Sequence, residues 1–139
     1  MSVPAHESGF PFVRLAHHVW SERCHADGYF AGEADVRGYR FVDAQTTEWR
    51  ASTFAEGVEV KDLGTSDGTS MQLVRFAPGA SFPIHTHAGP EFVYLLEGEA
   101  VQNGQCLYAG WAATAATGTV DEHFHSPTGC MFLTVYSDD

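Results

Sequence analysis

Residues 82–92 read FPIHTHAGPEF, with two histidines one residue apart and a glutamate four positions after the second. Side chains two apart on a β-strand point the same way, so His85 and His87 direct both imidazoles into one space. Glu91 follows an Ala-Gly-Pro break, and a turn there would return its carboxylate to the same place. Imidazole nitrogens and carboxylate oxygens are ligands for several divalent metals. The stretch indicates either a metal site or a polar patch on a surface strand.

Outside this stretch, short apolar segments alternate with turn residues, which is typical of a β-sandwich or β-barrel. The dipeptide Asn103-Gly104 is a strong signal for a tight hairpin. A weak helix candidate occupies residues 14–23, and no internal repeat is visible. The expected strands are 58–63, 71–76, 82–87, 91–96, 98–102, 105–108, 111–114, 120–125 and 130–136.

Composition narrows the classes of partner. The 139 residues are expected to form one domain with an extension, and the formal net charge is −11 at pH 7. Such a charge repels phosphate backbones and anionic membrane surfaces, so we expect neither nucleic acid nor a membrane as a partner. Three well-separated cysteines, Cys24, Cys106 and Cys130, fit free thiols in a reducing compartment. With no signal-peptide pattern at the start, the expected location is cytoplasmic.

The spacing around the histidines is more specific than the histidines alone. Gly79, five residues, His85, one residue, His87, three residues, Glu91, six residues and Gly98 reproduce the first motif of the cupin superfamily. This resemblance implies an all-β cupin jelly-roll, with the histidines and the glutamate pointing into the barrel. We expect Gly79 to turn the chain into the ligand strand and Gly98 to end the next strand in a turn. The predicted cupin domain spans residues 45–139, and residues 1–44 form an N-terminal extension.

The second motif of the superfamily departs from its usual pattern, which leaves the fourth metal ligand open. Gly110 and Gly118 fit, but the position that usually holds histidine is Asp121. On a regular strand Asp121, His123 and His125 share a face at roughly 6.6 Å intervals, so only one of them reaches a given ion. Asp121 is favoured by spacing and His123 by ligand chemistry. We favour His123 narrowly, then Asp121, then His125.

Longer matches narrow the resemblance to small ChrR-type cupins. They are FAPGA at 76–80, HTHAGPE at 85–91 and LLEG at 95–98. The zinc anti-sigma factor ChrR carries a separate N-terminal zinc domain whose ligand spacing is missing from residues 1–45, so anti-sigma activity does not carry over. The HTHAGP segment is also similar to acetylacetone and dihydroxyacetophenone dioxygenases, which use non-haem iron.

These resemblances imply an enzyme, a metal-dependent dioxygenase-like oxidoreductase that acts on a small diketone or hydroxyketone. The alternative is a metal-binding sensor or regulatory module without turnover. The expected ion is Fe²⁺ before Zn²⁺, Mn²⁺ or Ni²⁺. We also expect a homodimer, because sheet edges need cover, and residues 1–44 are a plausible contact.

Overall fold

The computed structural model describes residues 34–137, which form strands and turns and no helix. The weak helix candidate at residues 14–23 lies outside this range. In the described part of the chain, no helix is long and apolar enough to cross a membrane. The strands are β1 (Ala34–Val36), β2 (Tyr39–Phe41), β3 (Arg50–Ala51), β4 (Val58–Ser66), β5 (Thr69–Phe76), β6 (Ser81–Phe82) and β7 (His85–Thr86). They continue with β8 (Glu91–Gln102), β9 (Gln105–Tyr108), β10 (Ala112–Ala115), β11 (Val120–Asp121), β12 (Phe124–His125) and β13 (Cys130–Ser137).

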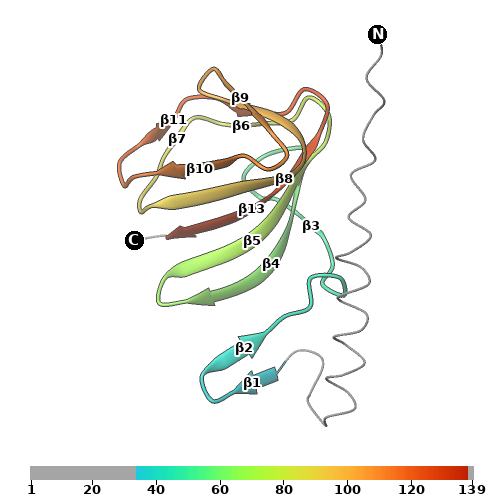
Figure 1. Cartoon of the computed structure of the whole chain (residues 1–139), viewed down its shortest axis with the longest axis vertical. Helices are drawn as coiled ribbons and strands as arrows, with labels where there is room; N and C mark the ends of the chain where they lie inside the picture. The colour runs from blue at the N-terminus through green and yellow to red at the C-terminus, as the bar shows by residue number, and fades with distance from the viewer. Residues whose placement is uncertain (1–33, 138–139) are drawn as a thin grey trace.

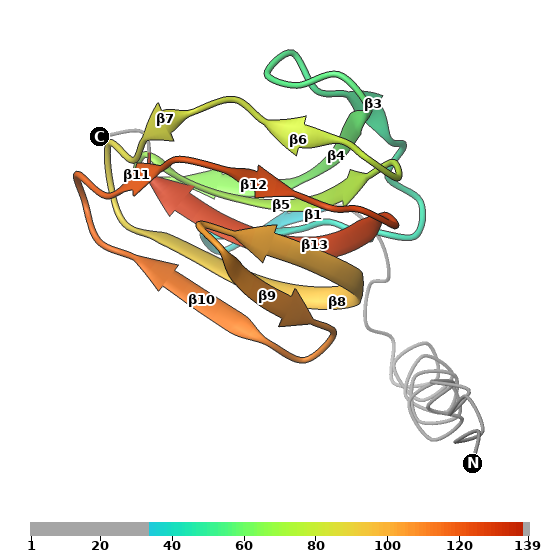
Figure 2. The same ribbon diagram turned by 90° about the horizontal axis from the view of Figure 1, so that it is seen from above.

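One antiparallel sheet dominates the fold, in the order β3-β4-β5-β13-β8-β12-β6, with β9 and β10 also paired to β8. Strands β7 and β11 form a separate pair, as do β1 and β2. The long strands β4, β5, β13 and β8 lie side by side, and the short strands curl over from one end of this row (Figures 1 and 2). This curled all-β architecture confirms the predicted cupin jelly-roll.

The core lies on the concave side of the curl. Its centre is a group of phenylalanines from four strands, Phe76, Phe82, Phe124 and Phe132, whose ring centroids are 4.7–6.5 Å apart. Aromatic rings in such tilted and edge-to-face arrangements are favourable beyond the area they bury. Leu95, with no exposed surface, packs in the same cluster. This core holds in place the strands that carry the residues of the candidate site.

The predicted hairpin at Asn103-Gly104 is confirmed. The φ angles of Asn103 and Gly104 are 48° and 84°, and Gln102 pairs with Gln105 across the turn. Two central residues with positive φ define the turn that matches the twist of a β-hairpin.

Several strand boundaries differ from the predicted ones. Segments 91–96 and 98–102 form the single strand β8, so Gly98 lies inside a strand and the turn expected there is wrong. Gly98 pairs with Cys130 instead, and a β-bulge follows at Leu96, because Met131 pairs with Glu97 and Phe132 with Leu95. The segments 82–87 and 120–125 are each divided into two short strands.

Candidate metal centre

His85 is held by its backbone neighbours and by aromatic rings. Its Nδ1 lies 2.9 Å from the carbonyl oxygen of Pro83, which accepts the Nδ1 proton. In this tautomer Nε2 keeps a lone pair for a metal. The ring packs edge-on against Phe54 and Phe82, at centroid distances of 5.1 and 6.0 Å. The imidazole is therefore oriented before any ion binds.

His87 lies deeper, with only 8% of its surface exposed. Its backbone N–H donates to Thr119 and its carbonyl accepts from Gly118, both at 2.9 Å, which ties the residue to the loop before β11. Both of its ring nitrogens are buried without a hydrogen bond of acceptable geometry, although Nε2 lies 2.5 Å from Glu91 Oε2. A buried imidazole without hydrogen bonds is costly unless another partner, such as a cation, takes its lone pair.

Glu91 begins β8, and its side chain points to the concave face, as those of Val93 and Leu95 do. The turn at residues 88–90 therefore returns the carboxylate to the histidines, as the sequence predicted. The hydroxyl of Thr134 donates to Glu91 Oε1 at 3.2 Å and leaves Oε2 facing His87.

His85, His87 and Glu91 each offer one ligand atom, and these atoms lie within 4.8 Å of one another. Two ligands of a first-row ion, each about 2.1 Å from it, are separated by roughly 3 to 4 Å. Separations of up to 4.8 Å exceed this range by less than 1 Å, so small side-chain rotations would bring the three atoms onto one ion. An ion between His87 and Glu91 would also relieve their short contact. Within residues 34–137 this is the one group of three or more metal-ligating side chains. It is a candidate divalent-metal site.

Of the three candidates for the fourth metal ligand, Asp121 is the one that faces this cluster. It pairs with His85 across β11 and β7, and its Oδ2 lies 3.8 Å from His85 Nε2. The side chain is 4% exposed; Oδ2 accepts a long hydrogen bond from Gln102 at 3.4 Å, and Oδ1 has no partner. A buried carboxylate beside the His85 imidazole needs a positive charge to compensate its burial.

His123 and His125 lie elsewhere. The chain leaves its strand path between β11 and β12, so the side chain of Phe124 enters the core while His123 is exposed. The two imidazoles contact each other, with centroids 4.4 Å apart. Asn103 fixes the break: its Oδ1 accepts the backbone N–H groups of Glu122 and His123. Residues 121–125 therefore do not form one regular strand, and Asp121, His123 and His125 do not share one face.

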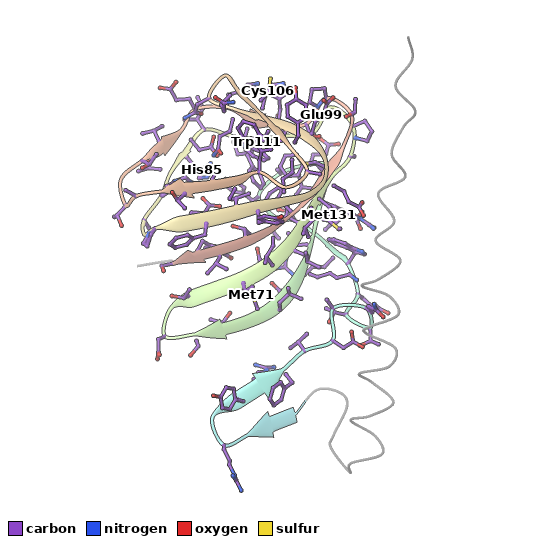
Figure 3. The ribbon with its side chains drawn as sticks, in the orientation of Figure 1. Met71, His85, Glu99, Cys106, Trp111 and Met131 are labelled. Atoms are coloured by element: carbon purple, nitrogen blue, oxygen red, sulfur yellow. The ribbon has the colours of Figure 1, made fainter. Side chains whose placement is uncertain are left out.

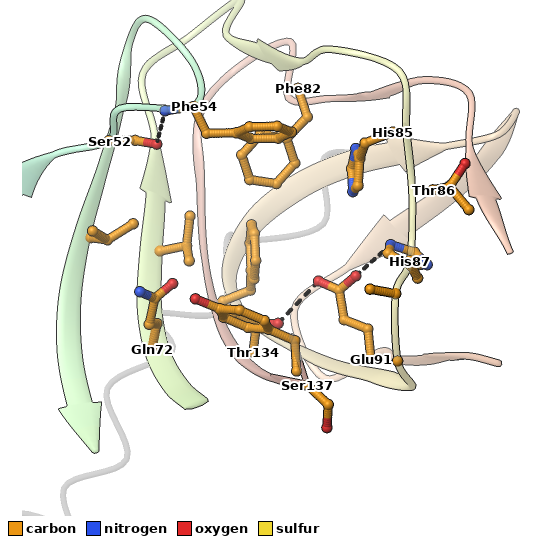
Figure 4. A pocket seen from close by; sticks show the side chains of 16 residues that line it. Ser52, Phe54, Gln72, Phe82, His85, Thr86, His87, Glu91, Thr134 and Ser137 are labelled. Carbon is orange, nitrogen blue, oxygen red and sulfur yellow. Dashed lines mark hydrogen bonds and ion pairs between the residues drawn. The ribbon is translucent and has the colours of Figure 1, made fainter. Parts of the chain in front are cut away.

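A cavity of about 400 Å³ opens beside the cluster and is shown in Figure 4. His85, His87 and Glu91 lie along one side, with Phe54 and Phe82 next to them and Gln72 on the opposite wall. We call this space the main cavity. Its other lining residues are Ser52, Val60, Val74, Thr86, Ala88, Gly89, Phe132, Thr134, Tyr136 and Ser137.

The wall opposite the cluster carries a polar network. Arg50 binds both carboxylate oxygens of Asp62, at 2.7 and 3.0 Å, and Gln72 donates to the same carboxylate at 2.7 Å. These hydrogen bonds, that from Arg50 first, lower the pKa of Asp62. The network orients the Gln72 amide on the cavity wall. No spacing in the sequence identified Gln72 or Thr134, because cross-strand register brings them to the cavity.

A curled antiparallel sheet with inward histidines and a glutamate after a Gly-Pro turn defines a cupin. The sequence profile of the ChrR cupin-like domain matches residues 38–137, so the chain belongs to the ChrR cupin-like family. No curated protein matches the chain.

Solved structures share the fold at low sequence identity. A proposed acetylacetone dioxygenase from Methylibium petroleiphilum is 18% identical, with a TM-score of 0.67 over 77% of this chain and 81% of that one. An acetylacetone dioxygenase from Acinetobacter johnsonii is 19% identical, with a TM-score of 0.63 over 78% and 79%. The anti-sigma ChrR of Rhodobacter sphaeroides, in complex with SigE, is 20% identical, with a TM-score of 0.59 over 69% and 51%.

Proposed function

We propose that this protein is a metal-dependent oxidoreductase of the non-haem dioxygenase type that acts on a small diketone or hydroxyketone. The observation that carries the proposal is the His85, His87 and Glu91 cluster at the wall of a cavity of about 400 Å³. That cavity is large enough for a small organic molecule. The likeness to acetylacetone dioxygenases supports the reaction type.

In this proposal Asp121 is the fourth ligand in place of His123, because only Asp121 faces the cluster. Two imidazoles and two carboxylates form a mixed nitrogen and oxygen set without sulfur, which suits Fe²⁺ or Mn²⁺ better than a softer ion. Bound Fe²⁺ would supply a Lewis acid for the two oxygens of a chelating substrate and a reductant for dioxygen.

The residues of the chain supply orientation and exclusion of water. The carbonyl of Pro83 holds the His85 tautomer, and Thr134 holds one oxygen of Glu91. Phe54 and Phe82 form an apolar wall against which the carbon skeleton of the substrate would pack. This packing would position the reactive carbons beside the cluster.

The test is dioxygen uptake by the Fe²⁺-loaded protein with acetylacetone and 2-hydroxyacetophenone, alongside metal analysis. The wild type should bind one ion per chain and consume dioxygen with at least one of these compounds. His87→Ala should lose both properties, and His123→Ala, the same change at an exposed histidine, should keep both. A wild type that holds its ion but consumes no dioxygen across a broad carbonyl panel would contradict the enzymatic proposal.

A regulatory cupin is the second candidate, favoured by the fold shared with ChrR in its SigE complex. It predicts a protein partner at one-to-one stoichiometry whose binding depends on metal or on an oxidant, without turnover. Affinity purification of the tagged protein with and without chelator separates the two proposals. Recovery of such a partner together with no dioxygen uptake would favour regulation.

We further propose a homodimer, formed through the convex face of the main sheet. Two cross-strand rows of apolar side chains cover β5, β13 and β8: Leu73, Leu133 and Tyr94 in one row, and Met71, Val135 and Phe92 in the next. Phe92 and Tyr94 are 51% and 47% exposed. Figure 3 labels Met71, which marks the β5 end of the second row. An apolar patch of this extent is typical of an interface.

A second copy is the occupant that the charge distribution favours. The chain carries a net charge of −11, so two copies repel each other over most of their surfaces. The two rows contain no charged side chain on β5, β13 or β8. At the β4 side, Trp49 already contacts Lys61 and Arg75. On the face formed by the two apolar rows, two copies would meet without bringing like charges together.

Tyr94→Glu tests this interface by placing a charge at its centre. Tyr39→Glu is the matched control, because Tyr39 is also exposed but lies on the β1-β2 hairpin, within residues 1–44. In sedimentation at fixed concentration, the wild type and Tyr39→Glu should be dimers and Tyr94→Glu a monomer. If Tyr39→Glu dissociates the dimer instead, the N-terminal contact expected from the sequence replaces the sheet face.

A further inference from the structure

The second pair of histidines, His123 and His125, lies away from the ligand cluster. Phe124 between them is 2% exposed and packs in the core, so the imidazole of His125 points to the opposite, outer side of β12. His125 is partly buried and His123 is exposed, and the two rings contact each other there. The proposed function assigns no role to either side chain.

The backbone holds both residues in place. The side-chain oxygen of Asn103 accepts the N–H groups of Glu122 and His123, at 3.1 and 3.2 Å, and the backbone N–H of Asn103 donates to the carbonyl of His123 at 2.9 Å. His125 lies on β12, which pairs with both β6 and β8. Bringing one nitrogen of each ring to a common ligand therefore requires only side-chain rotation, and the last torsion of a histidine is broad.

The separation of the two rings fits imidazoles bound to one ion. A nitrogen ligand about 2.0–2.1 Å from a metal places its ring centroid roughly 3.1–3.2 Å away, so rings on neighbouring coordination positions have centroids roughly 4.4–5.2 Å apart. The centroids of His123 and His125 are 4.4 Å apart. Those of His85 and His87, in the candidate metal centre, are 5.0 Å apart.

The surroundings favour a cation over an anion. Residues 76–139, which include β6, β8 and β12, contain no lysine or arginine, and Glu122 is exposed next to His123. The net charge of −11 also attracts divalent cations to the surface. Nδ1 of His125 is buried and has no hydrogen-bond partner within residues 34–137. A cation that takes the lone pair of this nitrogen would offset the cost of its burial.

We propose that His123 and His125 form a second divalent-metal site, separate from the cluster of His85, His87 and Glu91. Imidazole ligands suit Ni²⁺, Cu²⁺ and Zn²⁺, which such ligands bind more tightly than Fe²⁺. Within residues 34–137 no third metal-ligating side chain joins the pair, so water completes the coordination and the ion binds more weakly than at the cluster. Iron loading therefore leaves this site empty, and the inference does not rest on the proposed function.

Modification of histidines by diethyl pyrocarbonate tests the site in the wild type, with Ni²⁺ as the probe and peptide mapping as the readout. Ni²⁺ should slow the modification of His123 and of His125 by about fivefold or more, because a coordinated nitrogen cannot react. Mg²⁺ at the same concentration is the control ion and should protect neither, because it prefers oxygen ligands. Equal modification rates with the two ions would overturn the proposal.

Two variants show whether the histidines act together and apart from the cluster. In His125→Ala, Ni²⁺ should no longer protect His123, since one exposed imidazole holds the ion too weakly. His87→Ala is the matched control, the same change at the other pair, and should keep the protection of His123 and His125. Protection of His123 that persists in His125→Ala, or that is lost in His87→Ala, would overturn the two-histidine site. The wild-type comparison of Ni²⁺ with Mg²⁺ does not depend on either variant folding.

Discussion

Replacing Gly98 with alanine should destabilise the sheet far more than the same replacement at Gly104. Both glycines have positive φ, 76° and 84°, so both substitutions impose backbone strain. That strain is about 1–2 kcal/mol for a non-glycine residue and is offset by about 0.4–1 kcal/mol from the less flexible unfolded chain. A net loss of about 1 kcal/mol is therefore expected wherever space is free, as at Gly104, where an added Cβ meets no atom within 4 Å.

Space is absent at Gly98. A Cβ there would lie 2.2 Å from the carbonyl oxygen of Gly129 and 2.9 Å from Cys130 Cα. Both are backbone atoms, one of Cys130, which pairs with Gly98, and one of the residue before it, so no flexible side chain can yield. Overpacking of this kind costs about 1–3 kcal/mol, and each weakened ladder hydrogen bond about 1 kcal/mol more. We expect Gly98→Ala to lose about 3–4 kcal/mol in total.

Urea denaturation followed by circular dichroism, at one protein concentration, measures the difference. With a slope of about 1–3 kcal/mol per molar urea, Gly98→Ala should lower the midpoint by roughly 0.7–3 M more than Gly104→Ala does. Losses equal within about 0.5 kcal/mol would show that the conformational preference of glycine, and not the close approach of β8 to β13, explains the glycine at this position.

The remaining predictions concern the fourth ligand and the thiols. Asp121→Ala should weaken Co²⁺ binding at least tenfold in a chelator competition, while His123→Ala should leave it unchanged; the reverse order would return His123 to the site. Cys106, which is exposed, should be alkylated before Cys130 in a peptide-mapped time course. Burial raises the pKa of the Cys130 thiol, so at pH 8 its thiolate fraction falls below that of an ordinary cysteine. Equal rates would mean that β13 opens on the time scale of labelling.

Local patterns in the sequence predicted the features that local structure controls. The Asn103-Gly104 hairpin depends on two residues that adopt positive φ, and this signal needs no distant partner. The grouping of His85, His87 and Glu91 follows similarly from one strand, one turn and the start of the next strand. The cupin architecture was predicted because the spacing of these residues resembles the first motif of the superfamily.

Other features depend on contacts between distant segments, and here sequence reasoning failed. The chain breaks between Asp121 and Phe124 because the Asn103 side chain, from another hairpin, takes the backbone groups that a continuous strand would use. Gly98 lies within β8 because it pairs with Cys130 at the start of β13, with Gly129 close beside it. Neither partner is adjacent in sequence, so strand periodicity alone could not predict either result.

Strand β8 connects the metal centre with the proposed dimer interface. Its side chains alternate, so Glu91 and Val93 face the concave side of the sheet while Phe92 and Tyr94 face outward. A partner copy that packs on Phe92 would limit the motion of the backbone that positions the Glu91 carboxylate. Sites on paired strands hold their geometry more closely than sites on loops. If both proposals hold, dimer formation and metal binding favour the same β8 conformation, and each must then strengthen the other by the same free energy.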